Sequence, residues 1–124
     1  MKIIFVFNIY LDSYYITVGV LGGLKMMYIY VNVFEDRVLF SVIEFEEKEE
    51  YKIKEEEIIL PASFSMGNKL AYIKKIISVI IDQYNIKAYN MEVDDDIDID
   101  IIEVVKMEGV LEELFSCKGV MLWK

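Results

Sequence analysis

The sequence predicts an α+β domain organised around a mixed five-stranded sheet, and three observations lead to this prediction. Short segments rich in β-branched and aromatic residues follow one another between Tyr28 and Leu60, which is typical of an antiparallel meander. Helical spacing of apolar residues begins only after Pro61, and there it alternates with two further strand-like segments. The length of 124 residues suits one hydrophobic core and is too short for two ordinary domains.

The meander is expected to contain three strands, at Tyr28–Phe34, Arg37–Glu46 and Tyr51–Leu60. Glu35 and Asp36 form the first tight turn, and the charged segment Glu46–Glu50 forms the second loop. The acidic run Glu55–Glu57 is compatible with a helical turn, but a solvated strand at the edge of the sheet is the favoured interpretation.

Two helices and two strands complete the predicted order. Ser65 or Asn68 caps a first helix that ends at Asn85, and the strand Lys87–Glu92 follows it. The apolar face of this helix is formed by Leu70, Ile73, Ile76, Ile77, Ile80, Ile81 and Tyr84. A second helix is predicted from Asp98 or Asp100 to Phe115, and a last strand spans Gly119–Trp123.

The second helix carries three further expectations. Its buried stripe is predicted at Ile101, Ile102, Val105, Leu111, Leu114 and Phe115. Gly109 lies inside the helix, where glycine costs about 1 kcal/mol relative to alanine, and a close approach of the helix to the sheet would account for it. Cys117 is expected to be a small buried apolar residue.

Residues 1–26 form an apolar extension ahead of a domain that spans residues 27–124. One interpretation is an extra hairpin with strands at Lys2–Ile9 and Tyr14–Leu21. The other is upstream read-through, with natural translation starting at Met26 or Met27, because two adjacent glycine codons can spell a ribosome-binding sequence. The polar residues within the extension argue against a membrane span, and no clear signal-peptide pattern is present.

Composition excludes several kinds of chemistry. The formal net charge of −9 argues against a basic face that binds duplex DNA. Histidine is absent and Cys117 is the single cysteine, so catalytic sites that pair histidine with serine or cysteine are excluded. One cysteine cannot form an intramolecular disulfide, which favours a cytoplasmic protein. Acid–base chemistry falls to carboxylates, lysine or tyrosine.

Particular segments resemble the ribonuclease H-like superfamily. YIYVNVFEDRVLFSVIEF is similar to its opening hairpin, AYNMEV to its fourth strand, and VVKMEGVLEELF to the helix that follows. In detail the pattern resembles RuvC-type Holliday-junction resolvases and a small uncharacterised bacterial family related to them. The resemblance covers roughly residues 27–123 and implies a ribonuclease H-like sheet without the last helix of the family, because the chain ends at Lys124.

The resemblance implies two-metal phosphodiester hydrolysis, in which carboxylates hold two Mg²⁺ or Mn²⁺ ions about 4 Å apart. Glu92 matches the catalytic glutamate at the end of the fourth strand, and Asn32 occupies the position of the aspartate in the first strand. An asparagine offers a carbonyl oxygen but no charge. Asp94, Asp95 and Asp96 follow Glu92 and are candidate substitute metal ligands together with it.

Structural roles for these residues stay open. The segment Asp94–Asp100 also fits a solvated loop before a helix. Glu92 also fits an exposed end of a strand, and Asn32 also fits an ordinary polar residue within a strand. The favoured function is a resolvase-like domain with impaired or absent nuclease activity that binds branched or single-stranded nucleic acid. The alternative is an acidic protein-interaction module, a homodimer that buries Tyr28, Tyr30 and Trp123. Neither interpretation involves a membrane.

Overall fold

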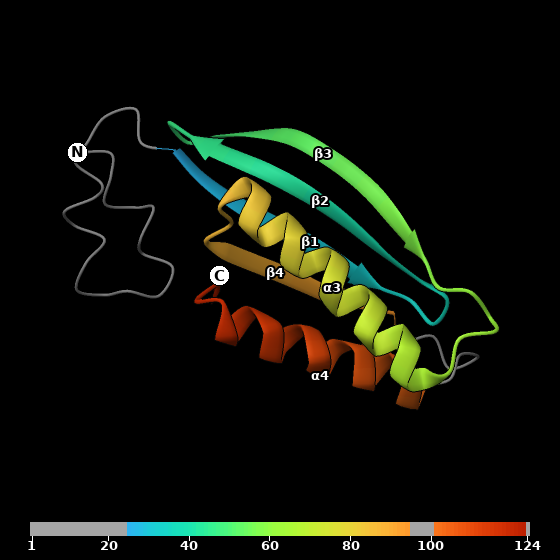
Figure 1. The fold of residues 1–124 in the computed structure, drawn as a ribbon. Coiled ribbons are helices and arrows are strands. Elements are labelled where there is room, and N and C mark those ends of the chain that lie inside the picture. The colour runs from blue at the N-terminus through green and yellow to red at the C-terminus, as the bar shows by residue number, and fades with distance from the viewer. Residues whose placement is uncertain (1–24, 95–100, 124) are drawn as a thin grey trace.

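The computed structural model describes residues 25–94 and 101–123. The expected N-terminal hairpin therefore lies outside the described residues. Figure 1 shows a sheet covered on one side by two helices, and the elements run β1 (Lys25–Val33), β2 (Arg37–Glu46), β3 (Glu49–Ile59), α3 (Met66–Tyr84), β4 (Ala88–Val93), α4 (Ile101–Cys117) and β5 (Met121–Leu122). This order confirms the predicted succession of strands and helices. No helix of the described part is both long and apolar enough to cross a membrane.

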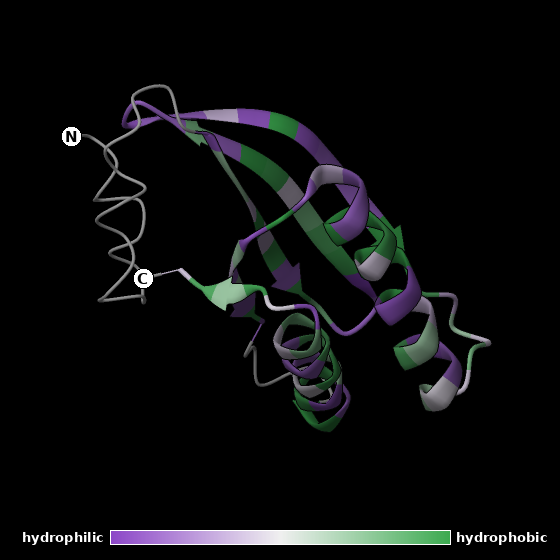
Figure 2. Ribbon diagram, turned by 60° about the vertical axis from the view of Figure 1, so that its left-hand side comes forward, coloured by the Kyte–Doolittle hydropathy of each residue, from purple (hydrophilic) through white to green (hydrophobic). Residues whose placement is uncertain are grey.

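The sheet has the strand order β3-β2-β1-β4-β5, with β1 at its centre. β1 pairs antiparallel with β2 and parallel with β4, and β2 pairs antiparallel with β3. The predicted α+β class and mixed five-stranded sheet are confirmed. β3 forms one edge, and its residues 49–57 are almost all exposed, as the solvated-edge interpretation requires. Figure 2 shows the contrast between this mostly hydrophilic strand and the more hydrophobic β2.

The hydrophobic core lies between the helices and one face of the sheet. Alternate residues of β1, among them Ile29, Val31 and Val33, point to the helices because successive strand side chains face opposite ways. The largest fully buried side chains are Phe40 of β2 and Phe115 of α4. Burying one such side chain contributes about 1.5–3 kcal/mol. This core fixes the register of β1, and hence which residues lie on the opposite face of the sheet.

Helix α3 begins and ends where the sequence indicates. The Ser65 hydroxyl accepts a hydrogen bond of 3.1 Å from the backbone N–H of Asn68, so Ser65 rather than Asn68 is the N-cap. Asn85 ends the helix with φ 53°, in the left-handed region that asparagine tolerates. The buried residues Ile73, Ile77, Ile80 and Ile81 all belong to the predicted apolar face.

Helix α4 corrects three predictions. Its buried residues are Val104, Met107, Leu111, Leu114 and Phe115, whereas Ile101, Ile102 and Val105 are 47%, 63% and 53% exposed. The first turns of α4 carry apolar residues on two sides of the helix. The side that packs on the core is the one on which Val104 and Met107 are followed by Leu111, at spacings of three and four residues. A side chain on Gly109 would meet no atom within 4 Å, so close approach to the sheet does not explain this glycine. Cys117 is exposed, not buried.

The face of the sheet opposite the helices carries a second, smaller cluster. Met26, Tyr28 and Ala88 are buried there, and Ile43, Phe45 and Trp123 pack against them. The rings of Tyr28 and Trp123 stack with their centroids 4.7 Å apart, and the Tyr28 hydroxyl donates a hydrogen bond of 2.8 Å to Glu50. Tyr28 is thus already buried within its own chain, so it is not available for the dimer interface predicted for it.

Candidate functional site

Asn32 and Glu92 lie next to each other near the carboxyl ends of two parallel strands. Asn32 on β1 is the register partner of Glu92 on β4, as Tyr30 is of Asn90. Register partners in adjacent strands point to the same face, and these point to the face opposite the helices. Carboxyl ends of parallel strands are where α/β folds place their ligands. The structure therefore brings together the two residues that sequence analysis selected as catalytic candidates, and their role stays a prediction.

Tyr30 is the third member of this site. It lies two residues before Asn32 and so on the same face of β1, and its hydroxyl donates a hydrogen bond to the Glu92 carboxylate. The hydrogen bond to Glu92, partial burial and the charge of Glu92 raise the pKa of Tyr30 above its ordinary value of 10.0. A hydrogen bond from the Asn32 side chain opposes part of this rise. The three side chains thus form one connected polar group.

Sequence analysis did not assign Tyr30 to this site. Its apolar ring placed it in the predicted dimer interface instead. One signal in the sequence could have found it: Tyr30 and Asn32 are two residues apart in a predicted strand, so their side chains are expected on the same face of the sheet. The contact between Tyr30 and Glu92, which are 62 positions apart in the sequence, depends on the parallel register of β1 and β4.

The acidic residues after Glu92 are only partly described. The backbone N–H of Asp94 donates a hydrogen bond of 2.8 Å to the carbonyl of Val33, which extends the contact between the ends of β4 and β1. Asp94 lines an open pocket of about 340 Å³ together with Phe34, Glu35, Asp36 and Arg37. Asp95 and Asp96 lie outside the described residues. Of the three candidate substitute ligands, only Asp94 is therefore located.

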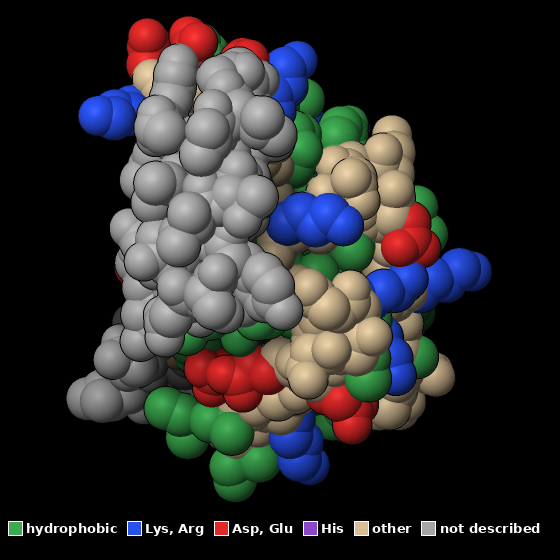
Figure 3. Space-filling model, turned by 90° about the vertical axis from the view of Figure 1, so that its left-hand side faces the viewer, with side chains coloured by type: hydrophobic (Ala, Val, Ile, Leu, Met, Phe, Trp, Pro, Cys, Tyr) green, Lys and Arg blue, Asp and Glu red, His purple; other side chains and the backbone are tan. Residues whose placement is uncertain are grey.

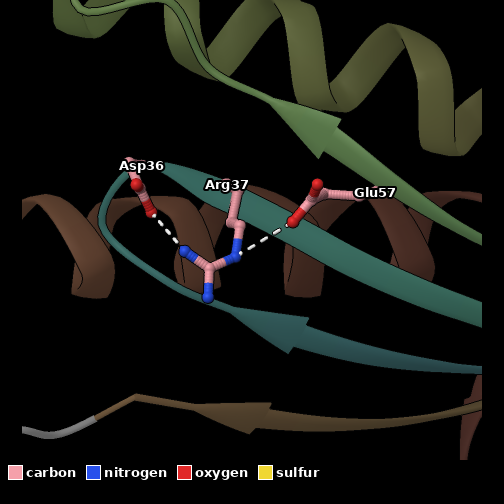
Figure 4. Close-up of polar contacts among 3 residues, drawn as sticks. All are labelled: Asp36, Arg37 and Glu57. Atoms are coloured by element: carbon pink, nitrogen blue, oxygen red, sulfur yellow. Dashed lines mark hydrogen bonds and ion pairs between the residues drawn. The ribbon is translucent and has the colours of Figure 1, made fainter.

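Arg37 holds the turn at this edge of the sheet. Figure 4 shows its guanidinium between two carboxylates, with Nη1 3.1 Å from Asp36 Oδ1 and Nε 3.1 Å from Glu57 Oε2. Its guanidinium carbon also lies 4.4 Å from the centroid of the Phe34 ring. These contacts join the turn between β1 and β2 to the edge strand β3. Because its charge is shared by two carboxylates, Arg37 is already engaged beside the candidate site.

A second pocket, of about 260 Å³, extends from the site across β2 to β3. It lies on the face opposite the helices and is lined by Tyr30, Asn32, Leu39, Phe40, Ser41, Ile43, Lys52 and Glu55. Its lining is mainly apolar, and Lys52 supplies a positive charge, paired with Glu55 at 3.3 Å. We refer to this pocket as the sheet groove. It is large enough to receive a small planar or aliphatic group beside Asn32 and Glu92.

Charge is mixed around the molecule. Figure 3 shows basic and acidic side chains interspersed on the described part of one face, with no single basic patch in that view. On the face opposite the helices, Lys52 is accompanied by Glu55 and by Glu92 itself. Long-range attraction of a polyanion to this site is consequently weak.

The described side chains do not fit a two-metal centre. Two divalent cations need several carboxylate oxygens, and the Tyr30–Asn32–Glu92 group offers one carboxylate, one neutral amide and a hydroxyl that donates to that carboxylate. Asp94 lines the neighbouring pocket beside Arg37. Within residues 25–94 and 101–123, no group of three or more His, Cys, Asp or Glu side chains is arranged to hold a metal ion. The described residues therefore supply too little negative charge for the chemistry that the resemblance implies.

The Tyr30–Glu92 hydrogen bond predicts a pH dependence of stability. Because the pKa of Tyr30 is raised in the folded state, its contribution is present below about pH 10 and is lost as the pH rises through the folded pKa. We expect Tyr30→Phe to lower the free energy of unfolding by about 1 kcal/mol at pH 8. The difference should shrink above pH 10. Urea unfolding at pH 8 and above pH 10 measures the difference in free energy of unfolding, with Tyr72→Phe on α3 as the control. A difference that does not change with pH would contradict the hydrogen bond between Tyr30 and Glu92.

Comparison with solved structures identifies the fold. Over 78% of its length, the chain superposes with a TM-score of 0.67 on Thermus thermophilus RuvC in complex with a Holliday junction substrate, at 9% identity. A Ppx/GppA family member of Aquifex aeolicus gives 0.54 over 81% of the chain at 12% identity. The human cytomegalovirus terminase nuclease domain, soaked with manganese, gives 0.52 over 78% at 8% identity.

The match covers only part of each of these proteins. The chain spans 62% of the RuvC chain, 35% of the Ppx/GppA protein and 45% of the terminase domain. Neither the protein-family models nor the sequences of curated proteins give a match. The central β1, the parallel pairing of β1 with β4 and the order of elements agree with the resemblance seen in the sequence. The described chain has the ribonuclease H-like fold.

Proposed function

We propose that this is a ribonuclease H-like domain in which two-metal nuclease activity is impaired or absent. The observation that supports the proposal is the position of Asn32 beside Glu92 at the carboxyl ends of β1 and β4. An asparagine there replaces a charged ligand by a neutral one. Tyr30 adds a hydroxyl that donates to Glu92, so the remaining carboxylate is engaged by a hydrogen bond from within the chain.

Residual activity would depend on Mg²⁺ or Mn²⁺ as the cofactor. Glu92 and the aspartates that follow it, Asp94, Asp95 and Asp96, are the residues of this chain that would have to hold the metal, with Asn32 contributing a carbonyl oxygen. Oxygen donors of this kind suit magnesium and manganese. We expect such binding to be weak at the wild-type site because Asn32 carries no charge.

The proposed partner is branched or single-stranded nucleic acid. Support comes from the fold shared with RuvC, whose matched structure holds a Holliday junction, and from the sheet groove beside Asn32. The aromatic ring of Tyr30 and the ammonium of Lys52 line this groove, and such groups bind bases and phosphates respectively. The net charge of −9 makes weak binding the expectation, with dissociation constants of about 10⁻⁴–10⁻⁶ M. The lone Cys117 supports the cytoplasm as the proposed compartment.

Fluorescence anisotropy with labelled four-way, single-stranded and duplex DNA in EDTA tests the partner. We expect four-way or single-stranded DNA to bind better than duplex DNA, and Lys52→Glu to weaken that binding several-fold. Lys75→Glu makes the same charge change on α3, in the helix layer that covers the other face of the sheet, and should have a smaller effect. Equal losses in the two variants would indicate attraction by net charge alone and would exclude the sheet groove.

A role in protein association is the second candidate. The observation that favours it is the exposure of three aliphatic residues at the start of α4. These residues differ from those predicted for a dimer interface, since Tyr28 and Trp123 stack on each other within the chain. The second candidate does not exclude the first, because α4 packs on the opposite face of the sheet from Asn32 and Glu92.

A further inference from the structure

Strand β3 gives the described sheet a long edge. It spans 11 residues, whereas β5 at the opposite edge spans two. In Figure 1, β3 lies at the margin of the sheet, with β2 along one side of it. An edge strand presents N–H and C=O groups that can pair with another extended chain, so proteins commonly keep such edges short. Within residues 25–94 and 101–123, no strand lies beyond β3, and its outer side is open to a further strand.

The hydrogen-bond pattern identifies the backbone groups of β3 that point outward. The N–H of Leu60 donates a hydrogen bond of 2.9 Å to the carbonyl of Asp36, so the backbone groups of Leu60 point toward β2. Inward and outward directions alternate along an antiparallel pair. The register with β2 has no shift from residue 59 back to residue 54. The N–H and C=O groups of Glu55, Glu57 and Ile59 consequently point away from β2.

Residues 54–59, which we call the edge segment, form the regular part of this edge. The pairing of β3 with β2 has a register shift between Val42 and Ile43, which falls at the start of the edge segment. Pro61 follows shortly after its end. Prolines and bulges are devices that prevent strand pairing at an edge, and the sequence has no proline or glycine within residues 54–59. A segment of about six residues has the length of an ordinary strand pairing.

The charge of the edge decides which kind of chain can pair with it. Residues 46–59 contain seven glutamates and three lysines, so this hairpin is acidic overall. The glutamates of the edge segment are exposed, although each has an ion pair within the chain: Glu55 with Lys52, Glu56 with Lys54, and Glu57 with Arg37. Opposite charges across adjacent strands are stabilising, and like charges are destabilising. The edge therefore favours a basic strand and disfavours an acidic one, including the β3 strand of another copy.

We propose that the edge segment binds an extended basic segment of another protein, which joins the sheet as a further strand beside β3. Hydrogen bonds to the outward backbone groups of Glu55, Glu57 and Ile59 supply the affinity, as in other cases of strand addition. The acidic side chains supply the specificity, because they attract basic chains and repel acidic ones. β2 separates this edge from the strands that carry Asn32 and Glu92, so the proposal does not depend on the proposed function.

Fluorescence anisotropy of labelled synthetic peptides with the full chain tests the partner chemistry. The probe is a peptide of about eight residues that alternates lysine and valine. We expect it to bind about tenfold more tightly than the matching glutamate–valine peptide. A lysine–valine peptide that is N-methylated on two adjacent central nitrogens keeps its charge but cannot pair along either edge, and it should bind as weakly as the acidic peptide. Equal binding of the methylated and unmethylated peptides, or no binding of either, would overturn the proposal.

A pair of substitutions at one position separates the backbone contribution from the charge contribution. Glu55→Pro removes an outward N–H and no hydrogen bond to β2, which is the kind of position where an edge strand tolerates proline. Glu55→Gln removes the same charge and keeps the N–H. We expect Glu55→Pro to weaken binding of the lysine–valine peptide about tenfold, and Glu55→Gln less than about threefold. Far-UV circular dichroism checks that both variants keep the fold. Equal losses in the two folded variants would contradict strand addition.

Amide hydrogen exchange in the wild-type chain locates the added strand without any substitution. The N–H of Glu57 points outward and should exchange quickly in the free protein, whereas the N–H of Glu56 points to β2 and should exchange slowly. Addition of the lysine–valine peptide is expected to slow exchange at Glu57 by about tenfold or more, with little change at Glu56. A bound peptide that leaves exchange at Glu57 unchanged would overturn the proposal.

Discussion

Replacing Asn32 by aspartate is expected to strengthen Mn²⁺ binding at this site by about tenfold or more. The substitution places a second carboxylate beside Glu92 at the adjoining ends of β1 and β4. Two carboxylates near one divalent cation add a large Coulomb attraction even in a partly exposed site. A tenfold change corresponds to about 1.4 kcal/mol. Isothermal titration calorimetry of wild type and variant measures it directly.

Two comparisons isolate the cause of this gain. Gln83→Glu also adds one negative charge, but on an exposed position at the far end of α3, and it should leave Mn²⁺ affinity unchanged within about twofold. Glu92→Gln in the Asn32→Asp background should abolish the gain. If Asn32→Asp bound Mn²⁺ no better than Gln83→Glu, residues 32 and 92 would not lie close enough to bind one metal ion together.

Replacing Phe115 by alanine is expected to destabilise the domain by about 3–5 kcal/mol. The Phe115 ring is fully buried and stacks on Tyr89 of β4, with centroids 4.1 Å apart. It therefore links α4 to the strand that carries Glu92. Its loss removes transfer free energy and leaves a cavity at the contact between helix and sheet. Urea unfolding at one fixed protein concentration measures the change.

Phe115→Leu is the matched control for this prediction, because it keeps an apolar side chain of similar volume. It should cost less than about 1.5 kcal/mol. A loss below about 1 kcal/mol for Phe115→Ala would mean that α4 contributes little to the core. Contacts other than the packing of α4 would then have to hold β4, and with it Glu92, in position.

Most of the fold could be predicted because the strongest patterns are local. Helix α3 has a clear N-cap at Ser65, one apolar face and an asparagine at its end, and each feature acts within a few residues. The charged edge strand β3 follows from its alternating and acidic sequence. The neighbourhood of Asn32 and Glu92 followed from the resemblance, since no local pattern joins residues 60 positions apart.

The orientation of α4 was predicted incorrectly because its first turns are apolar on two sides. Ile101, Ile102 and Val105 have the same hydrophobic character as Val104 and Met107, so periodicity alone could not decide which set faces the core. Tertiary packing against α3 and the sheet decided it.

Tyr30 was missed for a different reason. A tyrosine in a strand is common because its ring packs well on a pleated surface, so its presence alone does not indicate a site. Only the three-dimensional register shows that its hydroxyl reaches Glu92. A polar contact that depends on the pairing of distant strands cannot be predicted from local sequence patterns.

The most direct test of the central claim is a cleavage assay with labelled four-way and single-stranded DNA in Mg²⁺ or Mn²⁺. We compare the wild type with Glu92→Gln at equal concentrations. The claim that Asn32 and Tyr30 leave Glu92 without an adequate metal site predicts no metal-dependent cleavage by either protein. Cleavage by the wild type that is lost in Glu92→Gln would contradict it and would establish an active nuclease.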